Sequence, residues 1–232
     1  MSHVRPTRTH RLKPKRTRVK RKSRNSKGPR FLLGLDLGQV RDYTAMVIVE
    51  RIMPKHPGDN IEYHLRHMER FELGTPYPEI VDEVSHLLNA PELRDCTSLI
   101  VDGTGVGIPV VEMFLNAGLS PTPIWITGGE SVSKNGRIFR VPKRDLVSVL
   151  QVCFQTSRLK ISSSIDMRDI LVNELMNFKV KITKSANDTY GVWREGIHDD
   201  LVLALSMACW CGEQMTKSSR TELYIEGISM KK

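Results

Sequence analysis

Three apolar segments of this sequence contain aspartate residues at positions where the neighbouring residues predict burial. Asp36 lies inside one strand-like segment, and Asp102 ends a second. Asp199 and Asp200 open a third segment, which is long and helix-like. Burying an unpaired carboxylate is costly, so buried acids are usually paired, used as helix caps or bound to a metal ion. The fold therefore has to supply partners for these acids.

Apolar periodicity predicts an α/β fold in which helices cover both faces of a sheet. Short apolar segments predict strands at 31–37, 43–52, 61–71, 98–102 and 123–127, and a late hairpin formed by 178–182 and 190–194. Apolar residues at helical spacing predict helices at 80–88, 106–117, 144–156, 166–178 and 199–210. The glycine-bearing segment 128–136 is expected to be a polar loop.

Basic residues are concentrated at the N-terminus. Residues 1–30 contain 13 of the 35 Lys and Arg residues and no Asp or Glu, which leaves 22 basic against 26 acidic residues elsewhere. Because this segment has almost nothing apolar to bury, we expect a disordered basic tail at 1–30, one folded domain at 31–215 and a loose polar end at 216–232. A basic tail binds phosphates without reading sequence, which favours a nucleic-acid partner. A solvated tail, or one that docks on an acidic protein or a membrane surface, is the alternative.

Each aspartate has a simpler structural explanation when taken alone. Asp199 is a preferred N-cap residue, Asp102 could shape the glycine turn after it, and Asp36 could pair with a buried arginine. Taken together, strand ends in an α/β sheet meet at one edge, and a helix packed there presents its first turn to the same point. Converging carboxylates repel one another unless cations lie between them, and Mg²⁺ prefers oxygen ligands. Two such ions would activate a water molecule and stabilise the leaving oxygen in phosphodiester cleavage.

Four segments carry a resemblance to a known family: LLGLDLGQVRDYTAMVIV, LIVDGTGVGIPVVEMFLNAG, VPKRDLVSVLQ and GIHDDLVLALSMA. In this order, over residues 31–212, they resemble the successive motifs of the nuclease domains of phage terminase large subunits. The resemblance implies a ribonuclease H-like mixed sheet flanked by helices. It also implies a two-metal-ion endonuclease that cuts concatemeric viral DNA during genome packaging, with Mg²⁺ or Mn²⁺ as its cofactor.

The same resemblance assigns roles to the aspartates. It implies that Asp36 and Asp102 are catalytic metal ligands, and that Asp199 and Asp200 supply the third ligand, with Asp200 slightly favoured. Asp42, six residues after Asp36, matches a further acid of some relatives and could hold a metal through water. An exposed turn acid is an equal alternative for Asp42.

A second group of residues is expected to contact DNA. Lys143 and Arg144, which open a helix after Pro142, match a basic position of the family near the DNA backbone. Three further residues extend this patch: Lys134, Arg137 and Arg140. A solvated basic face is the alternative. His198, next to the acids, either assists a proton transfer or only orients Asp199.

One motif of a complete terminase large subunit is missing. No ATPase P-loop of the form GxxxxGK followed by Ser or Thr occurs in these 232 residues. We therefore expect a nuclease whose motor is encoded separately, a split gene product, or a relative with another task such as recombination or repair. The resemblance implies double-stranded DNA as the substrate, and a separate ATPase motor subunit, a small terminase or a portal protein as candidate partners. No apolar run approaches the roughly 20 residues of a membrane span, so we expect no membrane association and a place in the cytoplasm, that of the host cell if the protein is viral.

Three other functions fit parts of the sequence. A Holliday-junction resolvase shares the fold and the acidic cluster, but needs dimer arms that the sequence does not reveal. Residues 36–38 and 102–105 resemble the phosphate loops of actin and sugar-kinase-type phosphotransferases, whose adenosine-binding motif has no convincing match. A non-catalytic DNA-binding packaging protein would use the tail and keep the acids for structure. No recognition helix is evident, so any DNA cleavage is expected to depend little on sequence.

Overall fold

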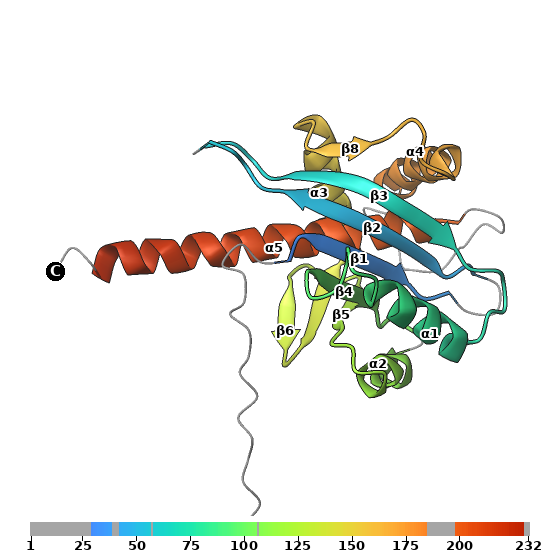
Figure 1. Cartoon of the computed structure of the whole chain (residues 1–232). Coiled ribbons are helices and arrows are strands. Elements are labelled where there is room, and N and C mark those ends of the chain that lie inside the picture. The colour runs from blue at the N-terminus through green and yellow to red at the C-terminus, as the bar shows by residue number, and fades with distance from the viewer. Residues whose placement is uncertain (1–28, 39–41, 57, 106, 185–197, 230–232) are drawn as a thin grey trace, which may run out of the picture.

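The computed structural model describes residues 29–38, 42–56, 58–105, 107–184 and 198–229, with side chains except those of 107, 179–184 and 217–229. Within these residues, eight strands form one mixed sheet with helices on both faces (Figure 1). This arrangement confirms the predicted α/β fold with a mixed sheet flanked by helices.

The elements follow one another in this order: β1 (Phe31–Asp36), β2 (Ala45–Ile52), β3 (Glu62–Arg70), α1 (Tyr77–Leu88), β4 (Thr97–Asp102), α2 (Gly107–Asn116), β5 (Thr122–Thr127), β6 (Ser133–Asn135), β7 (Ile138–Pro142), α3 (Lys143–Gln155), β8 (Leu159–Ile161), α4 (Arg168–Lys184) and α5 (Asp200–Ser229). The strand order across the sheet is β6-β7-β5-β4-β1-β2-β3-β8. β1, β2 and β3 pair antiparallel, whereas β4, β5 and β7 extend the sheet from the other side of β1 by parallel pairing. At the edges, β8 pairs parallel with β3 and β6 pairs antiparallel with β7.

Alternation along β1 divides its side chains between the two faces of the sheet. Leu33 packs in the core on the face covered by α1 and α2, where Phe114 of α2 is buried. Leu32 belongs to the core on the opposite face, with residues of α3, α4 and α5. Because side chains two apart along a strand share a face, Asp36 points to the same side as Leu32, toward α5.

The long helix α5 crosses the sheet over β1 (Figure 1). Its residues 201–211 are all buried, as expected for a helix that is enclosed on every side. At Gly34 the helix approaches β1 so closely that an added Cβ would lie 2.1 Å from the backbone oxygen of Ala204. A glycine at this position therefore sets the distance between the end of β1 and the start of α5.

The loose end expected from residue 216 stays a prediction, and the described backbone of 216–229 continues α5 to Ser229. This segment contains no proline, and Lys, Arg, Glu and Leu among its residues are good helix formers. Extending an existing helix also avoids the cost of nucleating a new one. None of the helices in the described part of the chain, α5 included, has an apolar stretch long enough to cross a membrane.

Two local predictions were wrong. Residues 178–182 belong to α4 and not to a strand, while their predicted partner 190–194 lies outside the described residues. Their alternating pattern is typical of a strand, but they continue a helix that is already packed in the core. The predicted loop 128–136 contains β6, which turns at Gly136, with a φ of 59°, into β7. The short strand β8 was not predicted at all, because three residues show no readable periodicity.

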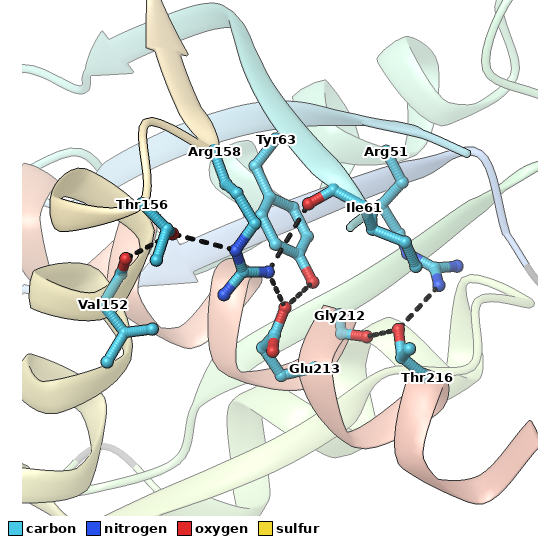
Figure 2. Close-up of polar contacts among 9 residues, drawn as sticks. All are labelled: Arg51, Ile61, Tyr63, Val152, Thr156, Arg158, Gly212, Glu213 and Thr216. Atoms are coloured by element: carbon cyan, nitrogen blue, oxygen red, sulfur yellow. Dashed lines mark hydrogen bonds and ion pairs between the residues drawn. The ribbon is translucent and has the colours of Figure 1, made fainter. Parts of the chain in front are cut away.

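A cluster of polar side chains fixes α5 at the end of the sheet away from Asp36 (Figure 2). The hydroxyl of Tyr63 and the guanidinium of Arg158 both donate to Glu213 of α5, each at 2.7 Å. Arg51 of β2 donates to the hydroxyl of Thr216 at 3.4 Å, and to the backbone oxygen of residue 29 at 2.9 Å. Arg51 thus connects the first described residues of the chain to Thr216 of α5.

Candidate active site

Two aspartates end neighbouring parallel strands. β1 and β4 pair with Leu35 opposite Val101, so the next residues, Asp36 and Asp102, lie side by side at the carboxyl edge of the sheet. Both are nearly buried, with exposed fractions of 8% and 7%. The backbone N–H of Thr104 donates to Oδ1 of Asp102 at 2.7 Å, which fixes this carboxylate against the turn that follows β4.

Two more aspartates lie at the start of α5. The backbone oxygen of Asp199 accepts the N–H of Leu203 at 2.9 Å, so Asp199 occupies the N-cap position and Asp200 is the first helical residue. Both are buried, with exposed fractions of 3% and 6%. The close approach of Gly34 to the backbone of Ala204 brings the start of α5 near the end of β1, and the charges of both acids raise the pKa of Asp36. The positive end of the helix dipole partly offsets the cost of these charges.

These carboxyl groups shift one another's pKa. Burial, followed by the charges of Asp102, Asp200 and Asp199, raises the pKa of Asp36 well above its ordinary value of 3.8. Burial also raises the pKa of Asp102, although hydrogen bonds with Thr104 and Asp36 oppose this increase. Nearby cations would stabilise the ionised form of carboxylates packed in this way.

Two basic residues of the chain contact the helix acids. Nζ of Lys143 donates to Oδ2 of Asp199 at 2.9 Å. Arg70, the last residue of β3, forms an ion pair with Glu174 and lies 3.4 Å from Oδ2 of Asp200. Lys143 was predicted to contact DNA, and the structure brings it into the acidic cluster itself.

Glu174 of α4 is an acid at this site that the sequence analysis missed. It is buried, and its Oε2 accepts the N–H of Val202 in the first turn of α5 at 3.0 Å. Burial is the largest cause of its raised pKa, which is about 7. A signal was available in the sequence. Glu174 lies three residues after Leu171 and four before Phe178, both buried, and therefore on the apolar face of its helix.

The structure does not bring Asp42 into this group. Asp42 is exposed, and its charge is not among the main causes of the raised pKa of Asp36. It lines a pocket of about 150 Å³, together with Gly38, Thr44, Glu72, Gly74, Thr75, Pro76 and Tyr77. Its predicted role as a metal ligand through water gains no support from this position, and the alternative of an exposed turn acid fits it.

His198 lies next to the acidic cluster, where it is close to Asp200. Its Nδ1 is 3.8 Å from Oδ2 of Asp200. The ring packs edge-on against Tyr43, with 5.1 Å between the ring centroids and an interplanar angle of 72°. The imidazole is thus held between a carboxylate and an aromatic ring, in a position to orient Asp200.

The remaining predicted DNA contacts are exposed on the β6–β7 hairpin and at the start of α3: Lys134, Arg137, Arg140 and Arg144. Lys134 and Arg140 lie over the rings of Phe139 and Trp125, at 4.6 and 5.2 Å from the ring centroids. Because β7 runs parallel to β5 and β4, its end reaches the same edge of the sheet as Asp102. Arg144, which follows the end of β7, therefore lies at the edge of the acidic cluster, whereas Arg137 donates to Ser120 before the start of β5, at the opposite edge of the sheet.

The donor chemistry of the cluster suits divalent cations. All the candidate ligands are carboxylate oxygens, which Mg²⁺ and Mn²⁺ prefer. In the part of the chain that the structure describes, no three His, Cys, Asp or Glu side chains are already arranged around one metal position. Lys143 and Arg70 contact the helix acids instead, so these carboxylates have to turn toward Asp36 and Asp102 to share an ion with them.

An antiparallel β1–β2–β3 unit extended by parallel β4 and β5, with acids ending β1 and β4, defines a ribonuclease H-like fold. Among solved structures, the chain is similar to the large terminase nuclease from thermophilic phage G20c. The likeness has a TM-score of 0.50 at 18% sequence identity, and covers 77% of this chain and 80% of that chain. At the level of the fold, this confirms the predicted resemblance to terminase nuclease domains.

Two other solved structures are similar over comparable lengths. The human cytomegalovirus terminase nuclease domain, soaked with manganese, matches with a TM-score of 0.45 at 14% identity, over 77% of this chain and 82% of that chain. RuvC from Thermus thermophilus matches with a TM-score of 0.29 at 14% identity, over 77% of this chain and 91% of that chain. No protein-family model and no curated protein matches the sequence. At such low identities the likeness concerns the fold, and the roles of the site residues depend on their own geometry.

Proposed function

We propose that this chain is a metal-dependent DNA endonuclease with a two-metal-ion site. The observation that carries the proposal is the convergence of Asp36, Asp102, Asp199 and Asp200, from two strands and one helix, at one edge of the sheet. Lys143 and Arg70 offset part of the charge of the helix acids, whereas burial and the neighbouring acids raise the pKa of Asp36. Burying these carboxylates together costs free energy that cations bound between them would offset.

The proposed ligands come from both sides of the cluster. Asp36 and Asp102 would hold the ions from the strands, and Asp200 would hold them from the helix, with Asp199 as the second acid there. Mg²⁺ or Mn²⁺ bound at this site supplies the Lewis acidity that activates a water molecule and stabilises the leaving oxygen. Lys143, now paired with Asp199, is placed to exchange this carboxylate for a phosphate oxygen of the substrate.

Double-stranded DNA is the proposed substrate. Arg144, exposed at the start of α3, lies at the same edge of the sheet as the acidic cluster, so a phosphate backbone held there would pass the carboxylates. The exposed basic residues of the β6–β7 hairpin would contact the backbone farther along the duplex. Residues 1–30 add further positive charge for salt-sensitive binding that does not depend on sequence. Both groups of basic residues would hold a duplex by its phosphate backbone and would not contact its bases.

The terminase-like fold suggests a biological task for this activity. We propose that the chain cuts concatemeric viral DNA during genome packaging in the host cytoplasm. An ATPase motor, a small terminase or a portal protein would be its partners. A fold hosts many functions, so this task depends on the likeness to terminase nucleases, whereas the nuclease chemistry depends on the carboxylates of this chain.

The test of the proposed activity is cleavage of supercoiled plasmid DNA by the purified full chain. Mg²⁺, Mn²⁺ and EDTA are compared, without ATP, for the wild type, for Asp36→Asn and for Asp82→Asn. Asp82 is an exposed acid of α1 and serves as the matched control. Nicking and linearisation that need a metal, disappear in Asp36→Asn and persist in Asp82→Asn are the expected result. No cleavage with either metal, or equal cleavage by Asp36→Asn, would contradict the proposal.

A further inference from the structure

Arg70 lies beside the acidic cluster without being one of the proposed ligands. It ends β3, and its side chain is only 13% exposed. Its guanidinium pairs with Glu174 of α4 and lies 3.4 Å from Oδ2 of Asp200. One side chain thus links the end of a strand, the middle of α4 and the first residue of α5.

Glu174 uses its two carboxylate oxygens for different partners. Oε1 accepts from Arg70, and Oε2 accepts the N–H of Val202 at 3.0 Å. Val202 follows Asp200 by two residues in the first turn of α5, where backbone N–H groups have no partner within the helix. The Arg70–Glu174 pair therefore holds the turn of the helix from which Asp200 projects.

The guanidinium of Arg70 is also held from its other side. It lies over the ring of Tyr43, 4.8 Å from the ring centroid, and Tyr43 in turn packs against His198. Its Nε is buried and has no hydrogen-bond partner among the described residues. The ion pair with Glu174 and the stacking on Tyr43 thus determine where this cation lies, and its looser contact with Asp200 follows from that position.

A simple helix cap does not explain this arrangement. A neutral Ser, Thr or Asn can cap a helix N-terminus without bringing a buried charge. Here a buried glutamate stands next to Asp199 and Asp200, and the N–H of Val202 and the charge of Arg70 both favour its ionised form. Unlike a neutral cap, the Arg70–Glu174 pair places a fixed cation beside Asp200.

We propose that Arg70 and Glu174 form a positioning pair that sets the orientation of the Asp200 carboxylate, and thereby the affinity of the acidic cluster for divalent metal. The pair touches neither metal nor DNA and acts through α5 and Asp200. This inference rests on the proposed function, because it assumes that the cluster binds metal. Residues that orient the ligands of a metal site in this way typically contribute about 10- to 100-fold to metal affinity.

The test measures Mn²⁺ binding to the full chain by calorimetry, without DNA, alongside thermal unfolding. Arg70→Gln is expected to bind Mn²⁺ on the order of tenfold more weakly than the wild type. Arg70→Lys, which keeps the charge but loses the planar fork, should recover part of the affinity. Glu174→Gln keeps an acceptor for the N–H of Val202 but loses the ion pair, and should also bind more weakly. Because the two residues act as one unit, the double variant should bind no more weakly than Arg70→Gln.

Arg51→Gln is the matched control. Arg51 is also buried, but it lies in the polar cluster at the other end of the sheet (Figure 2). This variant should lower the unfolding temperature and leave Mn²⁺ affinity unchanged. If Arg70→Gln fails to fold, Arg70→Lys and Glu174→Gln decide the outcome.

The outcomes separate this inference from the proposed function. A wild type that binds Mn²⁺, with Arg70 and Glu174 variants of equal affinity, overturns the positioning role and leaves the nuclease proposal intact. Tighter binding by Arg70→Gln overturns it as well, because the arginine would then be a competitor of the metal. A wild type that binds no Mn²⁺ overturns both.

Discussion

Asp36 and Asp102 end adjacent parallel strands and lie side by side at the carboxyl edge of the sheet. Burial and the neighbouring acids raise the pKa of Asp36, and burial raises the pKa of Asp102. Without a bound cation, the folded chain therefore favours a proton on this pair. A ligand that brings positive charge would replace the proton, so metal binding and protonation should compete at the cluster.

Asp36→Asn should abolish cleavage without lowering the stability of the metal-free protein. The amide removes a proposed metal ligand, so cleavage should be lost. It also removes a buried negative charge, so the metal-free variant should unfold at the same or a higher temperature than the wild type at neutral pH. Plasmid cleavage and thermal unfolding in EDTA measure the two effects. A variant that is inactive and much less stable would point to a structural role for Asp36.

The stability of the metal-free protein should fall as the pH rises. The pKa of Glu174 is about 7 in the folded state against an ordinary value of 4.5, so the folded state holds this proton longer than the unfolded state. Stability is then lost between about pH 4.5 and pH 7, by on the order of 3 kcal/mol from this group. Asp36 acts in the same direction. Urea unfolding in EDTA across this range should show the fall, and Glu174→Gln should reduce it. An equal fall in the variant would assign the effect to other groups.

Periodicity and burial cost were enough to predict most of the sheet and the location of the acids. β1 to β5 and the apolar faces of the main helices are long enough to show a regular pattern. Asp36, Asp102 and the Asp199–Asp200 pair were identified because each interrupts or opens an apolar segment. The structure places Asp102 beside Asp36 through strand pairing that an α/β topology implies, and their role as metal ligands stays a prediction.

The parts that could not be predicted depend on contacts between distant segments. Arg70 resembles any charged residue at the end of a strand, and only the packing of α4 beside β3 brings Glu174 to it. Lys143 was expected to contact DNA because it matches a basic position of the family, and the fold directs it to Asp199. Local sequence shows that a side chain is charged, whereas tertiary structure decides which partner it meets.

Lys143→Ala and Arg144→Ala should affect cleavage differently. Lys143 contacts the acidic cluster, so its loss should lower the cleavage rate at saturating DNA, by on the order of 100-fold. Arg144 is exposed on the same turn, so its loss should mainly raise the DNA concentration needed for half-maximal cleavage. Single-turnover kinetics at varied DNA concentration distinguish the two effects. Equal effects on both parameters would place Lys143 among the surface contacts.

Deleting residues 1–28 should weaken DNA binding and reduce its dependence on salt. The deletion keeps Arg30, which donates to Glu50 at 2.7 Å, and so leaves the described domain intact. For each phosphate that the shortened chain no longer neutralises, the slope of log affinity against log salt should become shallower by about 0.9. Fluorescence anisotropy with a labelled duplex in EDTA, at several salt concentrations, measures the slope. An unchanged affinity and slope would mean that the tail binds something other than DNA.

Gly34→Ala should disturb the acidic cluster from a distance. The added Cβ would lie 2.1 Å from the backbone oxygen of Ala204, so either β1 or α5 has to move. Overpacking of this kind costs about 1–3 kcal/mol or more, and a shift of α5 would carry Asp199 and Asp200 away from the strand acids. Gly129→Ala is the control, because its Cβ would meet only an ordinary contact at 3.5 Å. Chemical unfolding and plasmid cleavage should show a loss of both stability and activity for Gly34→Ala and neither for the control. Full activity in a destabilised Gly34→Ala would mean that the position of α5 is not set by this contact.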